Sequence, residues 1–302
     1  MNTNNIFINI GLHKCGSTFL QAEVLPKLKN LKPFTFIDND VLLKEFNYIS
    51  QCGEIYYEKE VENLISNYFN KKNDYFISSE GLSGMGYSNY NTGVLIKVIA
   101  NRIKNIFPNA KILIIIRNQR KAMESLYKDD VKYGFLNDYK SWVFFKKNNC
   151  GLDYFKYSNI VKVYQEIFGK NNVKVLLFEK FFNLDYLNRN FKEFGIDTSG
   201  LENVDFNKKY NESFSSISLR LTKVINRLFG SKLTHGVTFG KSPKLKVYNL
   251  WRYKISNLFN KYKGQYSFEF DEYENLLKDN FHDDNKRLSK LIEVNLDKYN
   301  YI

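Results

Sequence analysis

Cysteine, proline and long apolar runs are scarce in this sequence of 302 residues. The three cysteines, Cys15, Cys52 and Cys150, lie far apart without a CxxC pair, so they indicate neither a disulfide framework nor a zinc site. No apolar run reaches the roughly 18 residues of a membrane-spanning helix, and the N-terminus lacks the basic start and apolar stretch of a signal peptide. We therefore expect a cytoplasmic protein, with scope for peripheral contact at the inner face of a membrane.

Metal ligands and nucleic-acid motifs are also missing from the sequence. His13, His235 and His282 do not stand at the spacing of a ligand cluster, and no paired-aspartate motif occurs. No RNA-recognition, helix-turn-helix or zinc-finger signature is present. We therefore expect no bound metal and no nucleic-acid partner, while the oligomeric state stays open.

What is abundant is positive charge and apolar side chains. The 45 Lys and Arg outnumber 32 Asp and Glu, which gives a formal charge of +13 and a surface that attracts anions. Hydrophobic residues make up 43% of the chain and aromatic residues 17%, enough for a full core. Because no linker rich in Pro, Gly or Ser interrupts the chain, we expect a single domain over 1–302, with an α/β core in 1–200 and a mostly helical extension in 201–302.

Short β-branched and aromatic runs alternate with segments of helical period. The pattern predicts helices near 17–25, 59–71, 92–107, 119–134, 153–169 and 183–194, and further helices after residue 200. It predicts strands at Ile6–Ile10, Phe34–Ile37, Tyr75–Ser79, Lys111–Ile116 and Val173–Phe178. We therefore expect an α/β fold: a P-loop-like parallel sheet with helices on both faces and a helical C-terminal portion packed on it, with ligands at the carboxyl ends of the strands.

The first predicted strand leads into a loop with the composition of a phosphate cradle. Gly11, Lys14, Gly16, Ser17 and Thr18 lie between that strand and the first helix. Glycines let the backbone approach an anion, the helix start offers unpaired N–H groups, and lysine adds a charge. A tight turn with an N-capping serine would explain the glycines and serine as well, but not the lysine.

Three known loop types do not fit these residues. A Walker A loop needs Lys after its second Gly, whereas Lys14 precedes Gly16, and a Rossmann GxGxxG loop would need Gly where His13 stands. A phosphatase loop built on Cys15 would need Arg where Gln21 stands. The helix start favours a lowered pKa for the Cys15 thiol, but we expect this residue to line the loop passively.

A second motif follows the fourth predicted strand. In AKILIIIRNQRKAMESLYKDDVKYG a buried strand ends in Arg117, and Ser125 follows on the next helix. Arginine offers a two-pronged fork to a phosphate dianion, and serine adds a hydroxyl donor. Either residue alone is common at such a place, but both in this order after such a strand favour a second phosphate subsite.

The strand–GxxKxG[ST][ST]–helix motif and the Arg–Ser pair together resemble PAPS-dependent sulfotransferases. The resemblance implies 3'-phosphoadenosine 5'-phosphosulfate (PAPS) as donor and 3',5'-ADP as product. It implies that Lys14 contacts the transferred sulfuryl group and that the 5'-phosphate lies against the following residues, Cys15, Gly16, Ser17 and Thr18. Arg117 and Ser125 would bind the 3'-phosphate. The family usually has Pro where Gln119 stands here, so we expect a slightly different start of this helix in this chain.

Other segments extend the likeness to bacterial enzymes that sulfate carbohydrates or glycolipids. These are ISSEGLSG, FPNAKILIIIRNQ and a terminal DNxxL…YNY pattern. They imply a hydroxyl acceptor of the carbohydrate or glycolipid class. The family's basic loop over the adenine has no clear counterpart, and HGVTFGKSPKLK, with Lys241 and Lys244, is the weak substitute.

The acceptor hydroxyl needs a general base, and three residues compete for that role. Glu80 ends the third predicted strand, Glu45 in LLKEFNYI resembles the base of heparan-type enzymes, and His13 adjoins Lys14. We favour Glu80, then Glu45, then His13. Two other functions stay open: an atypical P-loop phosphotransferase, which needs Mg²⁺ and a nucleoside triphosphate, and a non-enzymatic basic module that binds anions.

Overall fold

The computed structural model describes residues 4–35, 42–69, 73–84, 93, 95–208, 210, 215–229 and 271–301. The chain divides into two compact units. The core unit comprises Met1–Ala122, Asn149–Tyr210 and Leu277–Ile302, and the second unit comprises Met123–Asn148 and Asn211–Leu276. Neither unit is one continuous stretch of sequence, because the chain passes from the core unit into the second unit and back twice.

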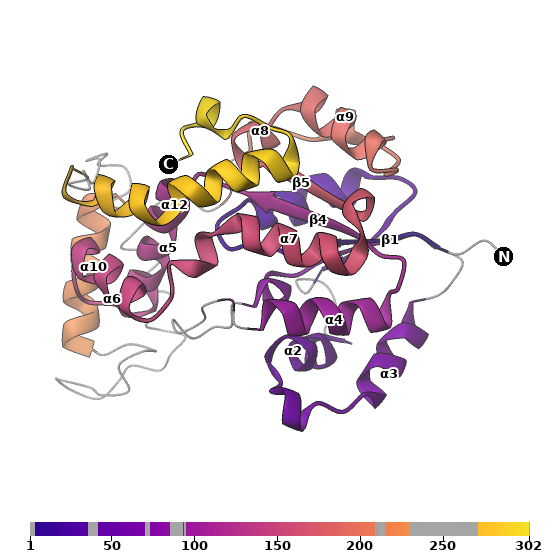
Figure 1. Cartoon of the computed structure of the whole chain (residues 1–302), viewed down its shortest axis with the longest axis horizontal. Helices are drawn as coiled ribbons and strands as arrows, with labels where there is room; N and C mark the ends of the chain where they lie inside the picture. Colours follow the sequence, from indigo (N-terminus) through magenta and orange to yellow (C-terminus); the bar gives the residue numbers. More distant parts are fainter. Residues whose placement is uncertain are drawn as a thin grey trace. The chain divides into compact units, whose positions relative to one another are not determined.

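The core unit is built on a parallel sheet with the order β2-β3-β1-β4-β5 (Figure 1). Its strands are β1 (Ile6–Asn9), β2 (Lys32–Thr35), β3 (Tyr75–Ser78), β4 (Lys111–Ile116) and β5 (Val173–Leu177). Ile8 pairs with Ile77 on one side and with Ile112 on the other, so β1 lies at the centre. Because all strands run the same way, their carboxyl ends meet at one edge, and the loops that follow β1, β3, β4 and β5 can form a common site there.

The strand predictions hold, with small shifts at the ends. β4 has the predicted bounds, since the run ILIII is buried on both faces as a central parallel strand requires. β1, β3 and β5 end one residue earlier than expected. β2 begins two residues before the expected Phe34 and includes Pro33; this is an edge strand, where a missing N–H leaves no neighbour unpaired. Residues 36–37 of that prediction lie outside the described residues.

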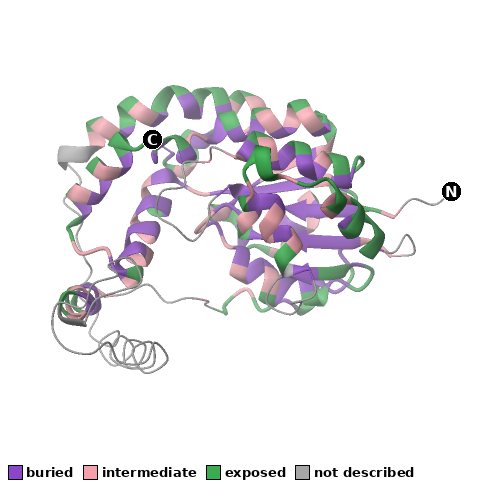
Figure 2. Ribbon diagram, turned by 90° about the horizontal axis from the view of Figure 1, so that it is seen from below, coloured by how far each residue is buried: buried purple, intermediate pink, exposed green. Residues whose placement is uncertain are grey.

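Helices cover both faces of the sheet, so the expected α/β class is confirmed. α7 (Tyr157–Phe168) packs against β4, β5 and α4 (Ile96–Ile106). α9 (Leu184–Glu193) brings Phe191 to 6.5 Å from Phe76, measured between ring centroids. Figure 2 shows the strands as buried almost throughout. The remaining helices of the core unit are α2 (Leu43–Gln51), α3 (Glu60–Tyr68), α8 (Phe178–Phe181) and the part of α12 (Asp271–Ile292) from Leu277 on.

The first helix departs from the expected continuous run near 17–25. α1 spans only Ser17–Phe19 and continues as a π turn, Leu20–Val24, and a 3-10 turn, Leu25–Lys27. Pro26 lies at the start of the 3-10 turn, where its missing N–H costs no hydrogen bond.

The second unit contains most of α5 (Gln119–Tyr133), together with α6 (Tyr139–Asn148) and α10 (Ser216–Phe229). Trp142 and Tyr127 are fully buried in it, and the Trp142 indole donates to the Asp130 carboxylate at 2.7 Å. Lys146 lies 3.6 Å from the same carboxylate. Burial raises the pKa of Asp130 and lowers that of Lys146, because a charge loses its hydration inside a protein.

Among the described residues, no helix has the length and apolar character to cross a membrane.

Candidate functional site

The loop between β1 and α1 is tightly folded against the end of β3. Gly11, Lys14 and Gly16 all have positive φ angles, of 63°, 63° and 90°. A side chain at Gly11 would place its Cβ 2.6 Å from the carbonyl oxygen of Ser79, so only glycine fits there. The close approach of this loop to the end of β3 therefore requires glycine at position 11.

Glu80 lies directly beside this loop. It begins the 3-10 turn Glu80–Ser83 that follows β3, and its Oε1 accepts a hydrogen bond from the Ser17 hydroxyl. His13 Nε2 lies 3.9 Å from Glu80 Oε2, and the Glu80 side chain is 46% exposed. The structure thus places two of the three candidate bases, Glu80 and His13, next to each other at the loop after β1.

A buried tyrosine joins the loop to the same turn. The Tyr154 hydroxyl accepts from the His13 backbone N–H at 3.2 Å and donates to Ser83 Oγ at 2.9 Å. Ser83 Oγ donates in turn to the Glu80 carbonyl at 2.8 Å. Burial raises the pKa of Tyr154, so its hydroxyl keeps its proton. This relay fixes the residue before Lys14 relative to the backbone of Glu80.

Arg117 lies at the carboxyl end of β4 and contacts the loop as well. Its guanidinium donates to the Lys14 carbonyl at 2.9 Å and stacks over the Phe178 ring at 4.2 Å. The same ring lies 3.3 Å from the Cβ position of Gly16. The Phe178 ring therefore packs against both the arginine and the loop.

Sequence reasoning did not identify Phe178 or Tyr154 as site residues. The available signal for Phe178 was its place at the carboxyl end of β5, next to β4. Tyr154 had no such signal, because its partners His13 and Ser83 are distant in sequence.

Cys15 corrects one expectation. Its side chain is 1% exposed, and burial raises the pKa of its thiol to about 12, although the charge of Arg117 acts in the opposite direction. The lowered pKa expected from the helix start is therefore wrong, since loss of hydration outweighs the charge of Arg117. Cys15 is a buried thiol under the loop.

The other predicted site residues lie elsewhere in the chain. Glu45 is on α2, a helix that packs against the turn Glu80–Ser83, and its Oε2 is buried without a hydrogen-bond partner among the described residues. Ser125 is on α5 in the second unit, whereas Arg117 belongs to the core unit. Thr18 follows Ser17 in α1. Lys241 and Lys244 lie outside the described residues.

Within the part of the chain that the structure describes, no group of three or more His, Cys, Asp or Glu residues could hold a metal ion. The polar groups at the edge of the sheet include the Arg117 guanidinium and the Ser17 hydroxyl, together with the Glu80 carboxylate.

Comparisons with known proteins bear on the fold. No protein-family model matches the chain, and no curated protein matches it. Among solved structures, the chain is similar to a sulfotransferase from Alicyclobacillus acidocaldarius, with a TM-score of 0.59 and 16% sequence identity. The likeness covers 99% of this chain and 100% of that one. The chain therefore has a sulfotransferase fold.

Proposed function

We propose that the protein is a PAPS-dependent sulfotransferase. The observation that carries the proposal is the contact between the Arg117 guanidinium and the Lys14 carbonyl, 2.9 Å apart. It joins two anion-binding elements, the loop after β1 and the end of β4, at the same edge of the sheet. Two phosphate subsites side by side suit a nucleotide that carries both a 5'-phosphosulfate and a 3'-phosphate. The fold shared with a sulfotransferase supports the same conclusion.

The transfer is an in-line displacement at sulfur. The acceptor oxygen forms a bond to the sulfur while the bond from sulfur to the bridging oxygen breaks, and 3',5'-ADP leaves with the bonding electrons. Negative charge therefore grows on the bridging oxygen. Lys14 and the N–H groups at the start of α1 stabilise this charge, a contribution on the order of 3 kcal/mol by analogy with single oxyanion donors. Arg117 binds the 3'-phosphate.

The proton of the acceptor hydroxyl passes to a carboxylate, for which Glu80 is our first choice. Its neighbours Ser17 and His13 belong to the loop that would hold the sulfuryl group. Glu45 is the rival, since its Oε2 is buried without a hydrogen-bond partner among the described residues, on a helix that packs against the same turn. His13 is the third candidate. The acceptor that we propose is a carbohydrate or glycolipid hydroxyl, reached in the cytoplasm or at the inner face of the membrane.

A calorimetric titration with 3',5'-ADP, ADP and GTP, each with Mg²⁺ and with EDTA, tests this proposal. We expect tightest binding of 3',5'-ADP and no loss of affinity in EDTA, because Lys14, Arg117 and backbone donors neutralise the phosphates. Mg²⁺-dependent preference for GTP or ADP would indicate a P-loop phosphotransferase instead. Similar weak binding of all three nucleotides would indicate a general anion-binding module.

A further inference from the structure

Two short patterns near the C-terminus, DNxxL and YNY, have no role in the chemistry above. Their polar members are Asp284 and Asn285 on α12, and Asn300 and Tyr301 after the 3-10 turn Leu296–Tyr299. Both patterns belong to the core unit. We call these four residues the C-terminal clamp. Each of them forms a hydrogen bond with one residue of another segment of the core unit: Asp284 with Ser158, Asn285 with Gln119, Asn300 with Asn118, and Tyr301 with Glu179.

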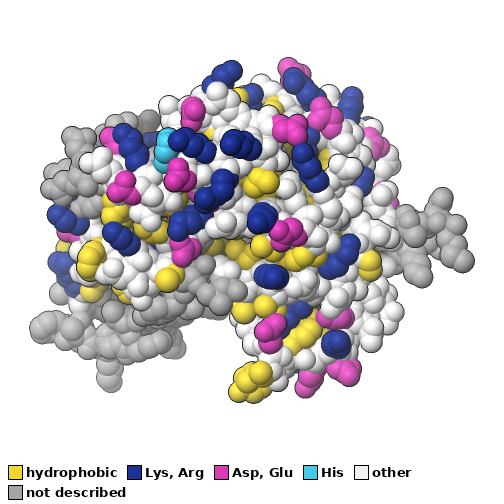
Figure 3. Space-filling view, viewed as in Figure 1, with side chains coloured by type: hydrophobic (Ala, Val, Ile, Leu, Met, Phe, Trp, Pro, Cys, Tyr) yellow, Lys and Arg dark blue, Asp and Glu magenta, His cyan; other side chains and the backbone are white. Residues whose placement is uncertain are grey.

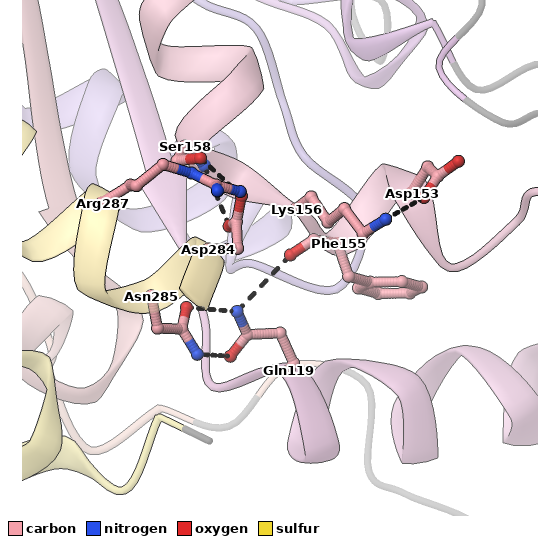
Figure 4. Close-up of polar contacts among 8 residues, drawn as sticks. All are labelled: Gln119, Asp153, Phe155, Lys156, Ser158, Asp284, Asn285 and Arg287. Carbon is pink, nitrogen blue, oxygen red and sulfur yellow. Dashed lines mark hydrogen bonds and ion pairs between the residues drawn. The ribbon is translucent and has the colours of Figure 1, made fainter. Parts of the chain in front are cut away.

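Asn285 forms a reciprocal amide pair with Gln119, the first residue of α5 (Figure 4). Gln119 Nε2 donates to Asn285 Oδ1 at 2.7 Å, and Asn285 Nδ2 donates to Gln119 Oε1 at 3.3 Å. Gln119 is 0% exposed and Asn285 4% exposed. In such a buried place an amide without its partner would cost about 1–3 kcal/mol, so the pair fixes the start of α5 firmly.

The neighbouring residue, Asp284, anchors α12 to a second helix. Its carboxylate accepts from both the backbone N–H and the hydroxyl of Ser158 at the start of α7, and it is 1% exposed (Figure 4). Arg287 lies 3.4 Å from the same carboxylate. The contact holds α12 against the start of α7, so Asn285, the next residue, lies on an anchored part of the helix.

The YNY pattern secures the residue between Arg117 and α5. Asn118 donates through its side chain to the Asn300 carbonyl and through its backbone N–H to Glu179 Oε1 at 2.8 Å. The Tyr301 hydroxyl donates to the other oxygen, Glu179 Oε2, at 3.0 Å. Asn118 Oδ1 also accepts from the N–H of Lys121 and so caps α5.

We propose that the C-terminal clamp positions Arg117 for the 3'-phosphate of the donor. Arg117 directly follows the last residue of β4. The next two residues, Asn118 and Gln119, are hydrogen-bonded to the clamp. A guanidinium fork binds a phosphate through two parallel hydrogen bonds, so a small shift of its backbone removes one of them. Gln119 takes the place of the proline that usually sets this turn in the family that the sequence resembles. The inference rests on the proposed function of Arg117, but none of the four clamp residues needs to touch the donor.

The variant Asn285→Leu tests the clamp, because it keeps the branched shape of the side chain and removes both hydrogen bonds to Gln119. Its control is Lys286→Ala on the exposed face of the same helix. The first readout is amide hydrogen exchange at Lys121 and Ala122, which are bonded to Asn118 at the start of α5. We expect faster exchange there, by about tenfold, with unchanged exchange in β4. Wild-type exchange at both amides would overturn the clamp, whatever nucleotide the protein binds.

The second readout is the ratio of the dissociation constants for 5'-AMP and 3',5'-ADP. Losing one charged hydrogen bond to the 3'-phosphate should lower that ratio about tenfold in Asn285→Leu and leave it unchanged in Lys286→Ala. A lowered unfolding temperature with a wild-type ratio would show a purely structural role and overturn the proposal.

Tyr301→Phe provides the same test if Asn285→Leu does not fold, since it removes one hydroxyl and keeps the ring. We expect a smaller fall in the ratio, about threefold, because Glu179 still accepts from Asn118. An unchanged ratio with unchanged exchange at Lys121 would overturn the clamp. A wild-type protein without preference for 3',5'-ADP would instead refute the proposed function, and faster exchange in the variants would still support the clamp.

Discussion

At the scale of single residues, the roles of the two glutamates can be separated. A general base acts on the transition state, so its loss should lower turnover and leave donor affinity nearly intact. We predict that Glu80→Gln lowers the turnover rate by about a hundredfold or more, with PAPS affinity unchanged within a few-fold. The amide keeps the shape of the side chain and can still accept from Ser17, which leaves basicity as the main difference.

Glu45→Gln is the matched control, since it makes the same chemical change at the rival position. Turnover should fall much less in this variant when PAPS consumption is followed under the same conditions. If turnover falls steeply in Glu45→Gln and persists in Glu80→Gln, the base is Glu45. If turnover persists in both variants, His13 is the remaining candidate.

The reactivity of Cys15 tests the packing beneath the loop. With a pKa of about 12, its thiol should carry a thiolate in only about one molecule in a thousand at pH 9, and its side chain is almost fully buried. We predict that iodoacetamide at pH 9 labels the exposed Cys150 and spares Cys15 in the folded protein, as peptide mass spectrometry would show. Equal labelling of the two would mean that the loop opens in solution. Bound 3',5'-ADP should not change the result for Cys150.

At the scale of elements, the relay from His13 through Tyr154 and Ser83 to Glu80 links the loop to the turn after β3. We predict that Tyr154→Phe lowers turnover by about tenfold, because it removes the shared hydroxyl and lets the loop shift relative to Glu80. The pH profile should keep its shape, since the tyrosine is protonated throughout the working range.

Tyr164→Phe is the comparison for that prediction. Tyr164 is equally buried, and its hydroxyl donates to the Leu82 carbonyl at 3.3 Å without touching the loop. Both variants should lose similar amounts of unfolding free energy in chemical denaturation. Equal effects of both on turnover would show that the Tyr154 hydroxyl contributes only to stability.

Elements with a strong local pattern could be predicted from the sequence. The run ILIII predicted β4, and the helical period after residue 200 predicted further helices there, of which α10 is one. The helices α2 and α6 were missed, because aromatic residues in LKEFNYISQ and YKSWVFFKKN mix with polar ones and suit strands or loops equally well. Propensity could not distinguish these states, since packing against the rest of each unit decides them.

At the scale of the whole molecule, the site depends on contacts between residues distant in sequence. Gln119 and Asn285 are 166 positions apart, and Asn118 and Asn300 are 182 apart, so no local pattern predicts either pair. The Lys14 loop and Arg117 were identifiable because each follows a strand with a recognisable motif. Their mutual contact followed only from the strand order, in which β1 and β4 are neighbours.

The charge of the molecule does not by itself identify the ligand. On the face shown in Figure 3, lysine and arginine side chains are interspersed with acidic ones. Lys162–Glu166 and Lys170–Glu293 are exposed ion pairs of the chain. Exposed pairs of this kind contribute little to stability and leave no large field of one sign around them. The net charge of +13 therefore favours anions in general, and the loop and Arg117 have to supply the specificity.

The binding of 3',5'-ADP and 5'-AMP to Arg117→Ala, compared with the wild type by calorimetry, tests the central claim most directly. The two nucleotides differ only in the 3'-phosphate that Arg117 is proposed to hold. We predict that the variant loses about a hundredfold in affinity for 3',5'-ADP and keeps its affinity for 5'-AMP within about twofold. Arg117→Lys, which keeps the charge and loses the fork, should lie between. Equal weakening of both nucleotides would contradict the account, because Arg117 would then support the loop without reading the 3'-phosphate.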